Sequence, residues 1–112
     1  MATELQKRAV DNLVEKYKEV EGAFIYIVKS GDFYKIGYAS SLSGRLHNFE
    51  GANPNGIELI WAAVFTEYKK LEKMIHERFN EKRVKGEWFK LNEEDIELIK
   101  KLDTIPIGYA DP

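Results

Sequence analysis

Two tyrosines, a glycine and an arginine are spaced in a way that could build a chemical site. Tyr26 and Tyr34 lie in neighbouring segments that we interpret as paired strands, so their side chains could reach one face, although the sequence leaves the register open. Gly37 allows a close approach of the backbone, or it eases the chain into the next turn. Arg45 follows Gly37 by eight residues, in an expected helix. Tyr26 taken alone is also typical of a core or cross-strand aromatic residue.

Glu72 and His76 lie four residues apart on one face of a later expected helix. Such a pair could bind a metal ion or contact a phosphate. The alternatives are a structural histidine and a solvent-exposed glutamate that pairs with Lys69 or His76. A zinc hydrolase would need a third protein ligand, and the sequence offers only His47 and scattered carboxylates for it.

The elements that must position these residues alternate between helices and short strands. "AFIYIV" and "FYKIGY" read as paired strands around Ser30-Gly31, and "IELIWAAVF" reads as a buried strand. "KGEWFKL" predicts a short strand after a turn at Gly86. Helices are expected over residues 3–20, 40–50, 67–82 and 93–102, the last capped by Asn92. The fold class is therefore α+β, an α/β sandwich with a small, mainly antiparallel sheet of three-stranded type flanked by helices.

The helix expected over residues 67–82 is the strongest in the sequence. An apolar stripe gives it an inner face, for which we expect Leu71, Met74, Ile75, Arg78 and Phe79. The chain has 112 residues, which predicts a single domain. Within it we expect an N-terminal helix (1–22), a core (23–91) and a C-terminal helix and tail (92–112).

Composition narrows the function classes. The chain has no cysteine, which excludes disulfides, thiolate metal sites and cysteine nucleophiles. No apolar stretch is long enough to span a membrane, and we expect a reducing cytoplasm. The net charge of −2 argues against a simple polycation that coats nucleic acid. A basic segment (66–92) precedes an acidic one (93–112), which permits phosphate binding or reflects two solvated helix faces.

The ordered set of motifs resembles the GIY-YIG nuclease superfamily. The matching elements are "FIY" (24–26), "KIG" (35–37), Arg45 eight residues after that glycine, and Glu72 on a later helix. "YKIG", "LEKMIHERF" and "GEWFKL" are closer to the small phage and bacterial subfamily than to the homing endonucleases. The resemblance covers residues 23–91.

The resemblance implies metal-dependent hydrolysis of a DNA phosphodiester, with DNA as the partner. Tyr26 would be the general base or orient the nucleophile, Arg45 would contact the phosphate, and Glu72 would bind one Mg²⁺ or Mn²⁺. The candidate catalytic residues are Tyr26, Tyr34, Arg45, Glu72 and His76, with Glu72 as the metal ligand. The candidate nucleic-acid contacts are Lys35, His47, Lys82, Arg83 and Lys85; the last three form a basic cluster that could equally be a solvated loop.

Several positions depart from the superfamily pattern. Phe24 replaces the first glycine, and Lys35 stands where the second tyrosine is usual, so that Tyr34 comes one place early. Either Tyr34 reaches back through a bulge, or Lys35 takes over part of its role. The superfamily histidine falls on Phe49. Glu87 is the nearest match by spacing to the late asparagine.

These departures support a second hypothesis, in which the fold is a non-catalytic module that binds nucleic acid or protein. A nuclease domain of this size ordinarily needs a targeting domain. We therefore expect a separate targeting partner or a homodimer, or a longer protein from which this chain is a piece. Trp88 either closes the core or stacks on a base.

Overall fold

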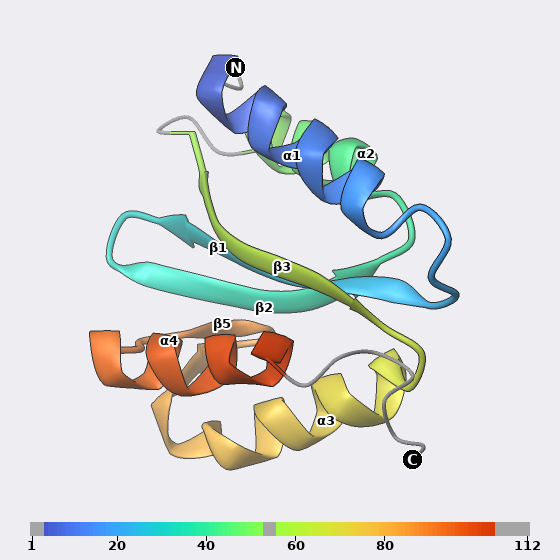
Figure 1. Cartoon of the computed structure of the whole chain (residues 1–112). Helices are drawn as coiled ribbons and strands as arrows, with labels where there is room; N and C mark the ends of the chain where they lie inside the picture. Colours follow the sequence, from blue (N-terminus) through green and yellow to red (C-terminus); the bar gives the residue numbers. More distant parts are fainter. Residues whose placement is uncertain (1–3, 53–55, 105–112) are drawn as a thin grey trace.

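The structure, a computed structural model, describes residues 4–52 and 56–104. Its elements, in chain order, are α1 (Glu4–Lys16), β1 (Ala23–Ser30), β2 (Phe33–Ala39), α2 (Leu42–Ala52), β3 (Glu58–Phe65), α3 (Tyr68–Arg78), the 3₁₀ turn η1 (Asn80–Lys82), β4 (Arg83–Lys85), β5 (Trp88–Phe89), α4 (Glu93–Lys100) and the 3₁₀ turn η2 (Lys101–Thr104). Figure 1 shows these elements in three layers, with the sheet in the middle.

The sheet of the described residues has five strands in the order β3-β1-β2-β5-β4, and every pair is antiparallel. The α+β class and the antiparallel sheet predicted from the sequence are confirmed. The sheet is larger than the three-stranded type, because "KGEWFKL" contributes to a hairpin rather than to one strand. Gly86 takes a left-handed φ of 57° at its turn, and Arg83–Lys85 folds back on Trp88–Phe89.

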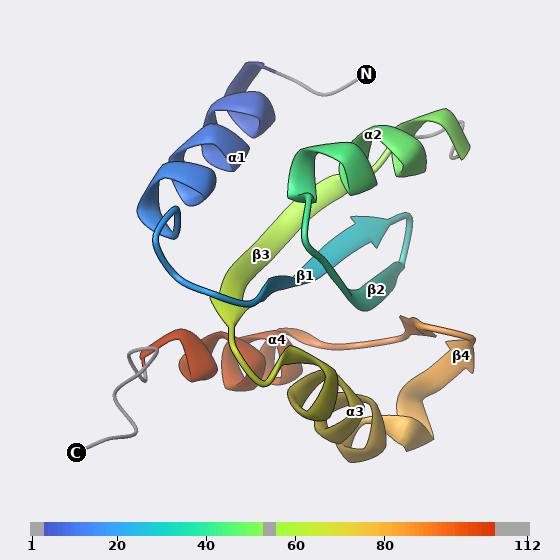
Figure 2. The same ribbon diagram turned by 90° about the vertical axis from the view of Figure 1, so that its right-hand side faces the viewer.

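Helices cover both faces of the sheet: α1 and α2 one face, α3 and α4 the other (Figures 1 and 2). Along β1, Phe24, Tyr26 and Val28 pack toward α1 and α2, whereas Ile25 and Ile27 pack toward α3 and α4. This two-sided burial explains why "AFIYIV" is a continuous apolar run instead of an alternating one.

The helices begin and end close to the expected positions; α1, α3 and α4 are shorter than expected, whereas α2 keeps the expected length two residues further along the chain. α1 ends at Lys16, and the helix expected over 67–82 ends at Arg78 before η1. α4 begins with a capping box: the Asn92 side chain accepts from the Asp95 N–H (2.8 Å), and the Asp95 carboxylate accepts from the Asn92 N–H (3.0 Å).

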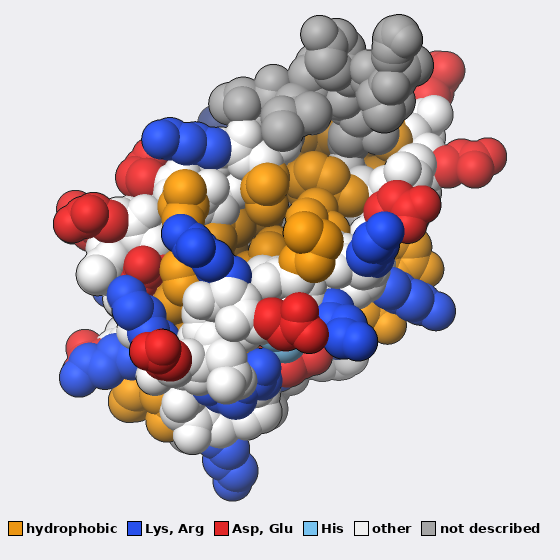
Figure 3. Space-filling model, turned by 90° about the horizontal axis from the view of Figure 1, so that it is seen from below, with side chains coloured by type: hydrophobic (Ala, Val, Ile, Leu, Met, Phe, Trp, Pro, Cys, Tyr) orange, Lys and Arg blue, Asp and Glu red, His pale blue; other side chains and the backbone are white. Residues whose placement is uncertain are grey.

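The inner face of α3 differs in part from the expectation. Ile75 and Phe79 are buried as predicted, but Met74 is 55% exposed and Arg78 is exposed, so for these two residues the prediction was wrong. The reason is that α4 packs beside α3 and leaves an apolar groove between them, on whose lining Met74 and Arg78 lie with Leu98. Figure 3 shows hydrophobic side chains gathered on this face, with charged side chains around them.

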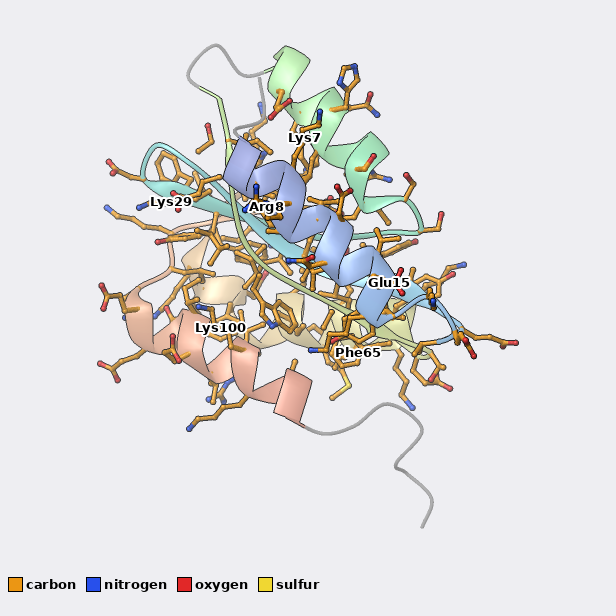
Figure 4. All side chains as sticks on the ribbon, turned by 45° about the horizontal axis from the view of Figure 1, so that its top comes forward. Lys7, Arg8, Glu15, Lys29, Phe65 and Lys100 are labelled. Carbon is orange, nitrogen blue, oxygen red and sulfur yellow. The ribbon has the colours of Figure 1, made fainter. Side chains whose placement is uncertain are left out.

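The solvent face of α1 is largely polar. Lys7, Arg8 and Glu15 lie exposed along α1 (Figure 4). Among residues 4–52 and 56–104, the structure contains no helix whose length and apolar character would allow it to cross a membrane.

Candidate active site

The candidate site lies at the edge of β2, where its pairing with β5 stops. β5 pairs with Tyr34 and Lys35 of β2, and the next residue, Ile36, donates its N–H to the carbonyl of Glu87 (3.1 Å). Gly37, which follows, is the register partner of Tyr26 on β1. Because β5 does not pair with β2 at Gly37, side chains from both helical layers can reach the backbone of β2 there.

Gly37 is required by the side chains that lie over it. A Cβ atom at this position would be 2.5 Å from the Tyr26 hydroxyl oxygen and 3.1 Å from Glu87 Oε1. Gly37 does not have a positive φ, so it meets no conformational demand of a turn. Of the two explanations for this glycine, the structure therefore favours the close approach of other groups to the backbone.

Tyr26 places a polar group in a fully buried position. Its side chain is 0% exposed, and its hydroxyl has no hydrogen-bond partner among the described residues. Burial raises the pKa of Tyr26 to about 12; the nearby Arg45 guanidinium lowers it, and the carboxylates of Glu87 and Glu72 raise it further. The phenol is consequently protonated at neutral pH and lies in the electrostatic field of three charged groups.

Glu72 and His76 approach the same edge from α3. His76 Nε2 lies 2.8 Å from the carbonyl oxygen of Ile36, and because a carbonyl only accepts, Nε2 carries the hydrogen and donates it. Glu72 Oε2 is 3.9 Å from this nitrogen and is buried without a hydrogen-bond partner in the part of the chain that the structure describes. Burial raises the pKa of Glu72. The neighbouring His76 and Lys35 act to lower this pKa, whereas the negative charge of Glu87 acts to raise it.

Glu87 brings a second carboxylate to the site, from the turn between β4 and β5. Its Oε1 lies 3.3 Å from Lys35 Nζ, and that ammonium lies 5.5 Å from the ring centroids of both Phe49 and Trp88. Side-chain exposure falls from 41% at Glu87 to 12% at Glu72. Glu72, His76 and Glu87 each offer one ligand atom, and these atoms lie within 4.8 Å of one another.

The structure brings together four of the five candidate catalytic residues: Tyr26, Arg45, Glu72 and His76. It places Tyr34 elsewhere. The β1–β2 register runs without a shift, so no bulge turns Tyr34 toward Tyr26, and its side chain packs on the α3–α4 face. Lys35 is instead the residue of β2 that lies on the same face of the sheet as Tyr26; that it takes over part of the role of the second tyrosine stays a prediction.

The candidate nucleic-acid contacts lie in three places. Lys35 belongs to the site, whereas His47 lines a cavity between α1 and α2. Lys82 pairs with Asp95 (2.5 Å), and Arg83 donates to Asn80 Oδ1 (3.0 Å) and to the Gly86 carbonyl. Lys85 is exposed on β4. Lys82 thus lies in η1 and is tied to α4, whereas Arg83 and Lys85 lie on β4.

Sequence reasoning did not include Glu87 among the site residues. The only indication in the sequence was that Glu87, in "GEWF", is the nearest match by spacing to the late asparagine of the superfamily. Neither spacing nor periodicity relates Glu87 to Glu72, because the β4–β5 hairpin sets their proximity. Phe49 was noted only as a replacement for histidine, but its ring lies against Tyr26, with 5.8 Å between centroids.

The fold and the site together define a small α+β domain in which a buried tyrosine, an arginine and a glutamate–histidine pair meet at a sheet edge. The chain belongs to the T5orf172 domain family, whose family model matches residues 23–102. This domain is found in phage and bacterial nuclease-like proteins, and membership suggests a nuclease or DNA-binding role. No curated protein and no solved structure matches the chain.

Proposed function

We propose that this protein is a metal-dependent endonuclease that hydrolyses DNA phosphodiester bonds through a GIY-YIG-type site. The observation that carries the proposal is that two buried oxygens, the Tyr26 hydroxyl and Glu72 Oε2, lack a well-formed hydrogen bond among the described residues, and that the Arg45 guanidinium acts on the Tyr26 hydroxyl. Buried polar atoms ordinarily have partners, and unpartnered ones that converge are typical of a functional site.

The residues present fit a hard divalent cation. Carboxylate oxygen is the ligand type that Mg²⁺ and Mn²⁺ prefer, and Glu72 Oε2 is the buried oxygen available to hold one. A cation bound there would stabilise the negative charge that develops on the scissile phosphate. His76 serves by position: its Nε2–H is fixed on the Ile36 carbonyl, which holds the ring beside Glu72.

Arg45 and Tyr26 supply the remaining functions. The planar guanidinium of Arg45 suits two non-bridging phosphate oxygens. Tyr26 orients the attacking water or removes its proton. A pKa of about 12 favours orientation, because the phenol holds its own proton at neutral pH.

A non-catalytic nucleic-acid-binding module is the second candidate. In its favour, Lys35 replaces the second tyrosine of the superfamily pattern, and its Nζ forms an ion pair with Glu87 Oε1 at 3.3 Å. Against it, Glu72 Oε2 has no hydrogen-bond partner among the described residues, and its contact with His76 Nε2 is long, at 3.9 Å. The first candidate therefore accounts for more of the site.

Cleavage of supercoiled plasmid tests the function. We expect the wild type to nick the plasmid with Mg²⁺ or Mn²⁺ and not with chelator, and Glu72→Gln to lose at least about 100-fold in rate. Glu77→Gln, an exposed carboxylate on the same helix, is the matched control and should cleave normally. Equal rates for Glu72→Gln and wild type would contradict the proposed site. Metal-independent DNA binding without cleavage would favour the module.

A further inference from the structure

We propose that Glu87 is a second carboxylate ligand of the cation held by Glu72, so that the cation site spans α3 and the β4–β5 hairpin. This inference rests on the proposed function only in taking the Glu72 site as a cation site. It goes beyond the proposed function by adding a ligand from another element of the fold.

The spacing of the ligand atoms is close to that of one coordination sphere, so that small side-chain shifts would complete it. The ligand atoms of Glu72, His76 and Glu87 lie within 4.8 Å of one another. Opposite oxygens around a six-coordinate Mg²⁺ are about 4.2 Å apart, at metal–oxygen distances of about 2.1 Å. Because His76 Nε2 donates its hydrogen to the Ile36 carbonyl, that atom is not free to bind a cation. Two carboxylates then remain as the oxygen ligands.

The buried oxygens around the cluster point to the same occupant. Glu72 Oε2 and the fully buried Tyr26 hydroxyl have no hydrogen-bond partner, and Glu87 Oε1 and that hydroxyl are both close to the position of a Gly37 Cβ. Glu72 is largely buried while Glu87 is partly exposed, and holding the two carboxylates close together beside a buried hydroxyl is costly unless a positive charge joins them. Lys35 supplies one at Glu87, but it forms no ion pair with Glu72 in the described part of the chain.

The backbone of Ile36 holds both sides of this site. Its N–H donates to the Glu87 carbonyl (3.1 Å), and its own carbonyl accepts from His76 Nε2 (2.8 Å). One strand residue thereby fixes the position of the hairpin carboxylate and of the helix histidine next to Glu72. Such backbone support is expected where ligands from different elements must keep a fixed separation.

Binding of Mn²⁺ to the full chain, without nucleic acid, tests the inference by electron paramagnetic resonance of the free ion. We expect Glu87→Gln to weaken Mn²⁺ binding at least about tenfold, since even residues that only orient a ligand cost about 10–100-fold. Glu87→Asp keeps the charge but withdraws its oxygens by one methylene, so it should bind between wild type and Glu87→Gln. Glu77→Gln should bind as wild type does. Thermal unfolding by circular dichroism verifies that each variant is folded.

The outcomes separate this inference from the proposed function. If Glu72→Gln loses Mn²⁺ while Glu87→Gln and Glu87→Asp bind like wild type, Glu87 is not a ligand, and the inference is overturned while the nuclease site stands. If wild type fails to bind Mn²⁺, or Glu72→Gln binds it normally, both proposals fail. Weaker binding by both Gln variants supports the two-carboxylate site.

Discussion

At the scale of single residues, the site depends on the absence of a side chain at Gly37. The Tyr26 hydroxyl and the Glu87 carboxylate occupy the space that a Cβ would need. The nearest atoms belong to a fully buried phenol, which cannot move aside as the end of an exposed, flexible side chain could. A substitution here should therefore displace the side chains of the candidate site before it disturbs the sheet.

Gly37→Ala is expected to reduce plasmid nicking at least about tenfold, because the methyl group displaces the Tyr26 hydroxyl. The free energy of unfolding should fall by about 1–3 kcal/mol, as in other overpacked sites. Gly51→Ala is the control: Gly51 is exposed in α2 with nothing near its Cβ position, and alanine should stabilise that helix slightly. Normal nicking by Gly37→Ala would show that the close approach has no role in cleavage.

Tyr26→Phe is expected to separate stability from activity. The buried hydroxyl has no well-formed hydrogen bond among the described residues, so at pH 7 its removal should leave the free energy of unfolding nearly unchanged, while nicking is lost. In the wild type the folded pKa of about 12 exceeds the ordinary value of 10.0, so stability is complete below pH 10 and falls as the pH rises toward 12. That fall amounts to roughly 2–3 kcal/mol.

Urea unfolding of wild type and Tyr26→Phe from pH 7 to pH 11.5 measures this difference. The wild type should lose more stability than the variant above pH 10. Parallel curves over the whole range would contradict the raised pKa.

At the scale of the elements, the sequence predicted most of the fold because local signals agree with the tertiary structure. "AFIYIV" and "FYKIGY" are rich in β-branched and aromatic residues around a tight turn, and Asn92 with Asp95 forms the capping box that starts α4. β4 was not resolved as a separate strand, because its three residues are all exposed and show no buried face. Helix α3 ends before the expected residue 82, because η1 and β4 return the chain to the sheet.

Asn92→Ala is expected to lower the free energy of unfolding by about 1 kcal/mol through loss of the helix cap. Its side chain accepts from the Asp95 N–H, and Asp95 in turn pairs with Lys82, so the variant loosens α4 against η1. Urea unfolding measures the loss, and Asn48→Ala, an exposed position within α2, is the control. Nicking should be unchanged in both, because no cap atom reaches Tyr26 or Glu72. If both variants lowered the free energy of unfolding equally, the capping box would make no specific contribution to stability.

At the scale of the whole molecule, the site combines side chains from both layers of helices and from the sheet between them. The order of Tyr26, Arg45 and Glu72 in the sequence was enough to nominate these residues. The role of Glu87 was not predictable, because it depends on a β2–β5 pairing of two residues and on the Ile36–Glu87 hydrogen bond. Tyr34 was misplaced for the same physical reason: one residue of register decides the face on which a strand side chain lies.

The contact between Lys35 and Trp88 gives the molecule a built-in optical probe. The chain has two tryptophans, and Trp61 on β3 lies on a strand separated from β5 by β1 and β2. Indole emission responds to nearby charge, and the Lys35 ammonium lies 5.5 Å from the Trp88 ring while it holds Glu87. A ligand or substitution that moves Glu87 or Lys35 would therefore change the electrostatic field at the Trp88 ring. With Trp61 replaced by phenylalanine, the colour and intensity of the fluorescence would report events at the sheet edge in real time, without an attached dye.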